Sequence, residues 1–232
     1  MRITSGSSGI FQANWYVVGP EHGNQCVVID PGQHAAQPCV AAVQALGRDP
    51  AAVLATHGHI DHIAAAAYLA DTWNVPLYIH GADRPFLTDP VAALTPDAAP
   101  MIHSLFPDGF HEPPDVREYQ LDSGSETGVC GIGGMEFQLR HAPGHTPGCT
   151  LLLLEDGTGP VAFTGDVVFA GSIGRTDFRV GDPAAMRRSL RRQVLSLPDA
   201  ARLLPGHGPA TSMAIERETN PYLREEFLNG AN

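Results

Sequence analysis

Thr56-His57-Gly58-His59-Ile60-Asp61-His62 is the most informative stretch of this chain, since it puts three histidines and an aspartate on one short loop. The apolar run 53–55 precedes it and predicts a buried strand, so the loop begins where a strand ends. His57 and His59 are two residues apart, and an extended backbone therefore points both rings the same way. Asp61 and His62 fall at the entry to an Ala-rich helical pattern, where neighbouring side chains diverge. Imidazole and carboxylate are ligands that divalent metals accept, so this stretch predicts ligands for two adjacent ions.

Three later segments carry the same kind of ligand. His145 lies in Ala142-Pro143-Gly144-His145-Thr146-Pro147-Gly148, Asp166 ends Phe163-Thr164-Gly165-Asp166, and His207 lies in Leu204-Pro205-Gly206-His207-Gly208-Pro209. Seven ligands exceed the need of one ion and suit two ions that share a bridging carboxylate. Pro-Gly-His occurs twice, each time after an apolar strand, which suggests two related halves meeting at one site. We therefore expect a dinuclear metal enzyme.

Each residue taken alone also has a structural explanation. Asp61 could cap a helix, and Asp166 could be a turn residue. A single histidine is more often a hydrogen-bonded polar group than a ligand. The dense spacing of the first stretch and its three counterparts together favour the metal centre.

Apolar runs separated by turns predict strands, and helical patterns lie between several of them. The predicted strands are Trp15–Val18, Cys26–Ile29, Val53–Ala55, Leu77–Ile79, Met135–Leu139, Thr150–Leu154, Val161–Phe163 and Arg202–Leu204. The predicted helices cover Val40–Leu46 with Gly47 as a stop signal, His62–Trp73 and Pro183–Leu197. Strands interleaved with helices indicate an α/β architecture. We expect a single domain over 1–232 with an irregular insertion around 81–118.

The composition excludes some functions. The net charge is −11, and all 14 basic residues are Arg. A nucleic-acid binder needs a basic stripe, so we expect no nucleic-acid partner. No apolar run reaches membrane-spanning length, and the four cysteines form no CxxC pair, so we expect a cytoplasmic protein without a membrane partner. The oligomeric state stays open.

These motifs resemble those of the metallo-β-lactamase-fold hydrolases, and within them the glyoxalase II (hydroxyacylglutathione hydrolase) branch. The 56–62 motif is specific for the superfamily, and 163–166 followed by Phe169-Ala170-Gly171-Ser172-Ile173-Gly174-Arg175-Thr176-Asp177 narrows the resemblance to that branch. The resemblance implies an αβ/βα four-layer sandwich, in which two facing mixed sheets are covered by helices. About two dozen residues follow His207, so we expect a small branch without the C-terminal helical domain of the classical enzymes.

The resemblance also implies roles for individual residues. His57, His59 and His145 would hold the first ion, and Asp61, His62 and His207 the second, with Asp166 bridging. Asp30 would support the metal loops from beneath. The ions would be zinc, with iron or manganese as alternatives. A hydroxide shared by the two ions, oriented by Asp61 and Asp166 as catalytic residues, would cleave the thioester of a 2-hydroxy acid and a low-molecular-weight thiol.

The resemblance leaves substrate anchoring and reaction class open. Arg175 stands where that family has a basic residue against the thiol, but Asp177 and Pro209 stand where classical members have tyrosines. Persulfide dioxygenases share the fold and also carry the motif found here at 174–178. Such an enzyme would hold one Fe(II) with His57, His145 and Asp166. A lactonase, a β-lactamase or a phosphodiesterase is less favoured, and a non-enzymatic binding module least.

Overall fold

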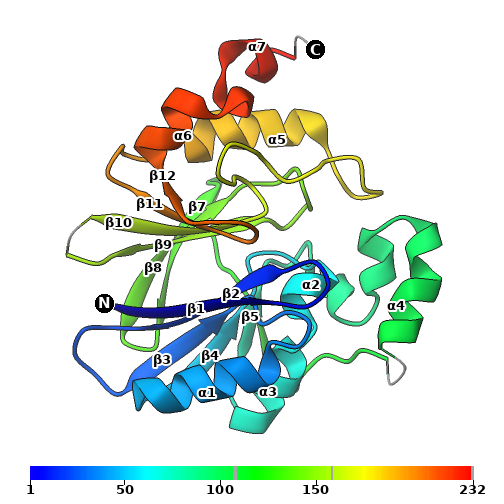
Figure 1. The fold of residues 1–232 in the computed structure, drawn as a ribbon, viewed down its shortest axis with the longest axis vertical. Helices are drawn as coiled ribbons and strands as arrows, with labels where there is room; N and C mark the ends of the chain where they lie inside the picture. Colours follow the sequence, from blue (N-terminus) through cyan, green and yellow to red (C-terminus); the bar gives the residue numbers. More distant parts are fainter. Residues whose placement is uncertain (107–108, 158, 231–232) are drawn as a thin grey trace.

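The strands predicted from apolar runs pair into two mixed sheets of six strands each, which face one another across the middle of the molecule (Figure 1). The structure, a computed structural model, describes residues 1–106, 109–157 and 159–230. Helices α1 (Ala36–Leu46) and α3 (Ala66–Trp73) cover the outer face of one sheet. Helices α5 (Pro183–Ser189) and α6 (Met213–Thr219) cover the outer face of the other. The expected four-layer αβ/βα sandwich is therefore confirmed.

The first sheet has the strand order β1-β2-β3-β4-β5-β6. Its strands are β1 (Arg2–Ser8), β2 (Ala13–Gly19), β3 (Gln25–Ile29), β4 (Asp49–Leu54), β5 (Leu77–Ile79) and β6 (Val116–Glu118). The first three pair antiparallel, and β3 to β6 pair parallel. The sequence did not predict β1, because its Ser- and Gly-rich residues carry no apolar signal.

The second sheet has the order β12-β11-β10-β9-β8-β7. Its strands are β7 (Thr127–Ile132), β8 (Met135–His141), β9 (Thr150–Glu155), β10 (Pro160–Gly165), β11 (Arg202–Pro205) and β12 (Thr211–Ser212). All neighbours pair antiparallel except β10 and β11, which are parallel. In both sheets the strands that lead into the predicted ligand loops are interior strands.

Successive residues of the interior strands are buried in different layers. Val28 packs toward the helices outside the first sheet, whereas Val27 packs into the core between the sheets. In β9, Leu152 faces that shared core, while Leu151 and Leu153 pack under α5. Strands buried on both faces read as continuous apolar runs, which is why the sequence revealed them.

The remaining helical segments connect or cover the sheets. They are α1 (Ala36–Leu46), α2 (Ile60–Ile63), α3 (Ala66–Trp73), α4 (Ala99–Leu105), α5 (Pro183–Ser189), α6 (Met213–Thr219) and α7 (Glu225–Leu228), with the 3-10 turns η1 (Arg84–Leu87), η2 (Pro90–Ala93), η3 (Pro96–Ala98) and η5 (Pro221–Leu223) and the π-helical η4 (Leu190–Val194). No helix of the described part of the chain is long and apolar enough to cross a membrane. The left-handed Gly47, with φ of 65°, ends α1 as the sequence predicts.

One predicted helix is divided. The expected continuous helix over 62–73 is wrong, because α2 ends at Ile63 and α3 begins at Ala66. Between them, the Ala65 N–H donates to the carbonyl oxygen of Pro31 at 2.9 Å, outside the helix. This division lets α2 place Asp61 and His62 independently of the direction of α3.

The segment 81–118 is more regular than the sequence predicts. It contains η1, η2, η3 and α4, and its last three residues form the edge strand β6. Proline begins or nearly begins each of these helical turns, and none exceeds seven residues, so no long periodicity could reveal them.

Candidate metal centre

The 56–62 loop leaves β4 and is held by Asp30, which follows β3. Thr56 donates to Asp30 twice, from its N–H to Oδ1 at 2.7 Å and from its hydroxyl to Oδ2 at 2.7 Å. Asp30 Oδ2 also lies 3.2 Å from His62 Nδ1. Asp30 itself has φ of 51°, a left-handed conformation that Asp tolerates better than most residues. Both its oxygens are thus engaged by residues of the loop, and its expected supporting role toward bound metal stays a prediction.

His57, His59 and His145 form the first group of candidate ligands. One nitrogen from each ring lies within 4.8 Å of the others, and all three residues are buried. His59 Nδ1 lies 2.7 Å from His145 Nε2. Among the described residues, the buried Nε2 atoms of His57 and His59 find no hydrogen-bond partner. Buried polar atoms without partners are rare, and a metal ion would satisfy such a cluster.

Asp61, His62 and His207 form the second group, again within 4.8 Å. His207 Nε2 lies 3.2 Å from Asp61 Oδ2 and 3.3 Å from His62 Nε2. The position of His207 is fixed from the first sheet, because the ring Nδ1 hydrogen-bonds to the backbone oxygen of Phe11 at 3.1 Å. Residue 207 and Ala13 also form an isolated β-bridge.

Asp166 lies between the two groups. Its Oδ1 is 3.4 Å from His62 Nε2, whereas its Oδ2 is 3.3 Å from His145 Nε2 and 3.5 Å from His207 Nε2. Oδ1 is buried and has no hydrogen-bond partner among the described residues. The carboxylate therefore has the position that a bridging ligand needs, and the structure brings all seven predicted ligands together.

The first group is electrically neutral. Burial lowers the pKa of His59 to about 3 and that of His145 to about 4. Burial also lowers the pKa of His57 well below its usual value, and the neighbouring His62 lowers it further. A metal binds the neutral imidazole, so this group can take an ion without releasing protons.

The second group holds protons instead. Burial works to lower the pKa of His62, but the carboxylates of Asp166 and Asp61 outweigh it and raise this pKa to about 10. Burial works to raise the pKa of Asp61, but His62 and His207 outweigh it and hold this pKa below its usual range. Binding an ion here would displace protons, so the two groups differ in how their metal affinity depends on pH.

Asp83 is a residue of the site that sequence reasoning missed. Its carboxylate is fully buried and accepts hydrogen bonds from Gly58 N–H at 2.8 Å, Gly148 N–H at 2.7 Å and the Thr146 hydroxyl. Both glycines are tight against it, since an added Cβ on Gly148 would lie 2.6 Å from the Asp83 carboxyl carbon. Asp83 thus joins the loop of the first sheet to the loop of the second.

His80 and His141 stack on each other beside this aspartate. Their ring centroids are 4.1 Å apart with planes 5° from parallel. Burial, with His141 second, lowers the pKa of His80 to about 4. The pair lies on the sheet edge that carries the ligand loops but contributes to neither ligand group.

Arg175 lies at the edge of the site, although its side chain is 60% exposed. The guanidinium makes two hydrogen bonds to Asp177, at 2.6 and 2.7 Å, and lies over the ring of Phe178 with 4.4 Å to the centroid. Its backbone oxygen bonds His145 Nδ1 at 2.7 Å, a contact no side-chain motif could reveal. The expected substrate contact of the side chain stays a prediction.

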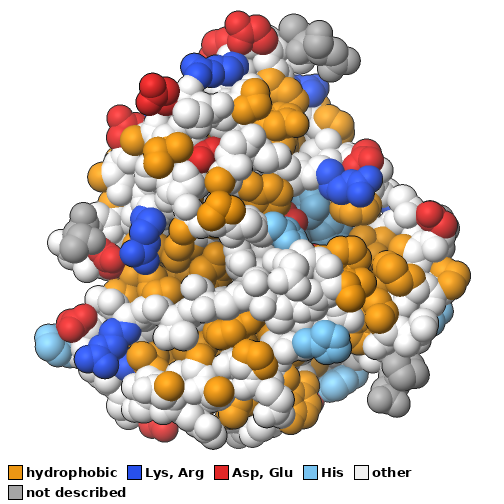
Figure 2. Space-filling view, viewed as in Figure 1, with side chains coloured by type: hydrophobic (Ala, Val, Ile, Leu, Met, Phe, Trp, Pro, Cys, Tyr) orange, Lys and Arg blue, Asp and Glu red, His pale blue; other side chains and the backbone are white. Residues whose placement is uncertain are grey.

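A cavity of about 510 Å³ opens above the ligands, and residues of both groups form its floor. Figure 2 shows histidine side chains in a hollow bordered by hydrophobic side chains. A ligand cavity of this size with convergent polar groups is typical of an active site.

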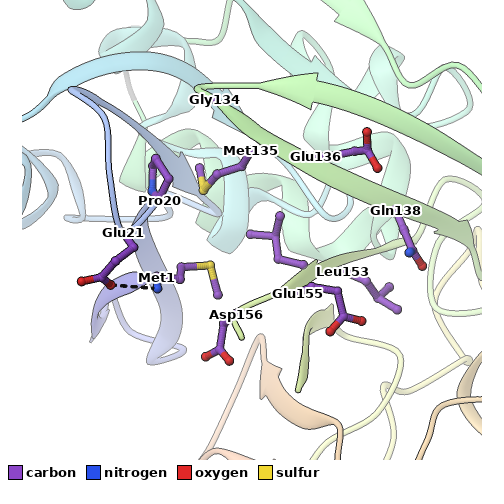
Figure 3. A pocket seen from close by; sticks show the side chains of 11 residues that line it. Met1, Pro20, Glu21, Gly134, Met135, Glu136, Gln138, Leu153, Glu155 and Asp156 are labelled. Atoms are coloured by element: carbon purple, nitrogen blue, oxygen red, sulfur yellow. Dashed lines mark hydrogen bonds and ion pairs between the residues drawn. The ribbon is translucent and has the colours of Figure 1, made fainter. Parts of the chain in front are cut away.

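A second cavity, of about 380 Å³, lies between Met1, the 20–21 turn and strands β8 and β9 (Figure 3). The Met1 ammonium pairs with Glu21 there at 3.1 Å. Among the described residues that line it there is no histidine. The chemistry is therefore assigned to the histidine cavity alone.

Residues 8–207 match the family model described as the metallo-beta-lactamase superfamily. An uncharacterized protein of Mycobacterium tuberculosis is 38% identical over 226 residues, which cover 96% of this chain and 98% of that protein. A protein of Haemophilus influenzae named hydroxyacylglutathione hydrolase GloC is 31% identical, with 93% and 95% covered.

Three solved structures are similar throughout. They are BLEG-1, a B3 metallo-beta-lactamase (TM-score 0.80, 31% identity, 96% of this chain and 99% of that one); TTHA1623 in a di-iron-bound form (0.75, 34%, 94% and 99%); and ETHE1 from Myxococcus xanthus (0.74, 26%, 99% and 89%). The similarity thus extends over proteins of more than one described function.

Proposed function

Because the chain belongs to the metallo-beta-lactamase superfamily, we propose that it is a metal-dependent hydrolase that cleaves thioesters of 2-hydroxy acids with a low-molecular-weight thiol. The observation that carries this proposal is the position of Asp166, whose carboxylate lies within 3.5 Å of histidines from both ligand groups. The relative named hydroxyacylglutathione hydrolase supports the thioester.

The unpartnered nitrogens of His57 and His59 and the unpartnered oxygen of Asp166 fit divalent ions. His57, His59 and His145 would hold one ion, and Asp61, His62 and His207 the other, with Asp166 shared. When bound, two such ions lower the pKa of water from 15.7 to about 7 and polarise a carbonyl group. We propose zinc for both and a cytoplasmic location.

The chain's own residues supply orientation. Asp61 and Asp166 present carboxylate oxygens on the cavity floor, where each can accept a hydrogen bond from the attacking water. Asp30 fixes the 56–62 loop and Asp83 joins it to the 142–148 loop, so the ligands do not need to reorganise during the reaction. The leaving thiolate is a weak base, so no separate acid is needed.

The test is turnover of S-lactoylglutathione together with elemental analysis of the same purified sample. The proposal expects thioester hydrolysis that disappears with a chelator and returns with zinc. Absence of turnover on S-lactoylglutathione and on simpler 2-hydroxyacyl thioesters, at full metal occupancy, would refute it.

A persulfide dioxygenase is the second candidate. It is supported by the similarity to ETHE1 from Myxococcus xanthus and by the Gly174–Phe178 motif, which borders the cavity. Oxygen uptake on a persulfide by protein loaded with Fe(II) would favour this candidate. Oxygen consumption without thioester hydrolysis would replace the first proposal by the second.

A further inference from the structure

The walls of the histidine cavity are apolar although its floor is polar. The 81–118 segment contributes one wall with Leu94, Ala98 and Met101, and Phe11, Phe169 and Ile173 line other parts. Met101 is 40% exposed and Phe11 48% exposed, so large apolar side chains face solvent at the mouth. Exposed apolar groups gathered beside a reaction centre usually mark a binding surface.

The same walls offer little positive charge. Apart from histidines, Arg175 is the sole basic side chain among the described residues that line the cavity. Its guanidinium is already paired with Asp177 through two hydrogen bonds. A substrate portion bearing free carboxylates would therefore gain little free energy of binding from these walls. An apolar portion would bind favourably there, because its surface is removed from water.

We infer that the site takes 2-hydroxyacyl thioesters whose acyl group carries an apolar chain of several carbons, in preference to the lactoyl group. This inference rests on the proposed function. The carbonyl carbon lies over the ligand floor, and the acyl chain lies along Leu94, Ala98 and Met101. The leaving thiolate needs solvent, and solvent is reached on the side of Arg175, whose side chain is 60% exposed.

Binding of the product acids tests this without catalysis. Lactate, 2-hydroxyhexanoate and 2-hydroxyoctanoate are titrated into zinc-loaded protein and into chelator-treated protein by calorimetry. Each methylene that leaves water should tighten binding roughly two- to fourfold. The dependence on acyl-chain length should persist without metal, because the wall is formed by side chains of the protein. Equal dissociation constants for the three acids would overturn the inference even if thioesters are hydrolysed.

Steady-state kinetics test whether the acyl chain lies along the wall formed by Leu94, Ala98 and Met101. In 2-hydroxyacyl thioesters of one thiol, kcat/KM should rise with acyl length. Met101→Gln should lower the ratio of kcat/KM for the 2-hydroxyoctanoyl thioester to kcat/KM for the lactoyl thioester roughly three- to tenfold. Ile215→Gln is the matched control, since Ile215 is a 53% exposed helical residue outside the cavity lining and should leave that ratio unchanged.

A second series keeps the acyl group and varies the thiol from charged to apolar. A rate that follows the thiol and not the acyl chain would overturn the assignment. No hydrolysis of any thioester, combined with chain-dependent binding of the acids, would refute the proposed function and leave the apolar wall established.

Discussion

At the scale of single residues, His59 links the first ligand group to the cavity. Its Nδ1 faces His145 at 2.7 Å, its Nε2 has no partner among the described residues, and it lines the cavity floor. We expect His59→Ala to weaken binding of one ion by more than about 100-fold, the upper effect of residues that only support ligands. Thioester turnover should be lost while the fold survives.

Metal content by elemental analysis and far-UV circular dichroism measure the two effects. His103→Ala is the control, because His103 lies exposed on α4 outside the cavity lining. A His59→Ala protein with wild-type metal content and rate would show that the assigned centre is wrong.

Asp83 makes a different kind of contribution, since it touches no ligand nitrogen but fixes both ligand loops. In Asp83→Asn, an amide NH₂ would face donors that now point at a carboxylate oxygen. A buried donor left without an acceptor costs about 1–3 kcal/mol, so we expect a loss of that size in the free energy of unfolding.

Urea denaturation measures this loss, and metal affinity should fall with it. Asp89→Asn is the matched control: Asp89 is exposed and caps η2 through one longer contact, 3.3 Å to Ala92 N–H. Equal stability of the two variants would mean that Asp83 does not hold the loops.

At the scale of elements, the loop after β11 approaches the Asp166 carboxylate very closely. A Cβ at Gly206 would lie 2.2 Å from Asp166 Oδ1 and 2.7 Å from His62 Cε1. Gly206→Ala must therefore displace the ligands or the loop, and we expect fewer than two ions per chain and a loss of about 1–3 kcal/mol.

Gly131→Ala is the companion variant, since nothing lies within 4 Å of a Cβ at that position of β7. Elemental analysis compares the two proteins after identical loading with zinc. Full metal content in Gly206→Ala would contradict the close approach.

The sequence predicted strands that carry apolar residues, whether in a continuous run as in β9 or in alternation as in β8, and failed where the tertiary environment decides. The runs in β3, β4, β9 and β10 are buried on both faces and were found, whereas β1 alternates between exposed and half-buried residues and was not. The break between α2 and α3 depends on the hydrogen bond from the Ala65 N–H to the Pro31 carbonyl oxygen. These residues are 34 positions apart in the sequence, so no local pattern could reveal the contact.

The candidate site divides in the same way. The sequence predicted the seven residues that the structure brings together, because candidate metal ligands have distinctive types and spacings. Asp83 was missed: it lies 25 positions from Gly58 and 65 from Gly148, and nothing in its local sequence marks it. The backbone oxygen of Arg175 on His145 was equally invisible, since any residue could supply it.

At the scale of the whole molecule, the ligands come from both sheets, so bound ions would cross-link the two halves. His57, His59, Asp61 and His62 follow β4, while His145, Asp166 and His207 follow strands of the second sheet. A ligand at 100 times its Kd adds about 2.7 kcal/mol to stability. Chelation should thus lower Tm by about 5–10 °C for each ion removed in a protein of this length.

Differential scanning calorimetry with chelator and with excess zinc measures this shift. The His59→Ala variant, deprived of one ligand, should show a smaller difference between the two conditions. A Tm independent of zinc in the wild type would mean that no ion joins the sheets.

The metal-free protein should have its greatest stability near pH 6.5. Below this pH the unfolded chain takes up protons on histidines that stay neutral in the folded protein down to about pH 4, as for His80 and His145, so stability falls. Above it, His62 keeps its proton in the folded protein up to about pH 10, so stability also falls as the pH rises.

Burial raises the pKa values of Asp83 and Asp166, so at acid pH these carboxylates bind protons more readily in the folded protein than in the unfolded chain. This favours the folded protein and should make the fall in stability below pH 6.5 less steep. The free energy of unfolding, measured by chemical denaturation between about pH 5.5 and 8.5, tests the expected decrease on both sides of pH 6.5. A stability that increases steadily from acid to alkaline pH would contradict the protonated state of His62.

The separation of the ligands along the chain has a consequence for how the protein is made. His62 and His207 lie 3.3 Å apart in space but 145 positions apart in sequence. During synthesis the ribosome therefore releases four of the seven candidate ligands long before the other three exist, and contacts of such long range form late in folding. A nascent first half carries only the candidate ligands of the 57–62 loop, so we expect complete loading with metal only after His207 has emerged.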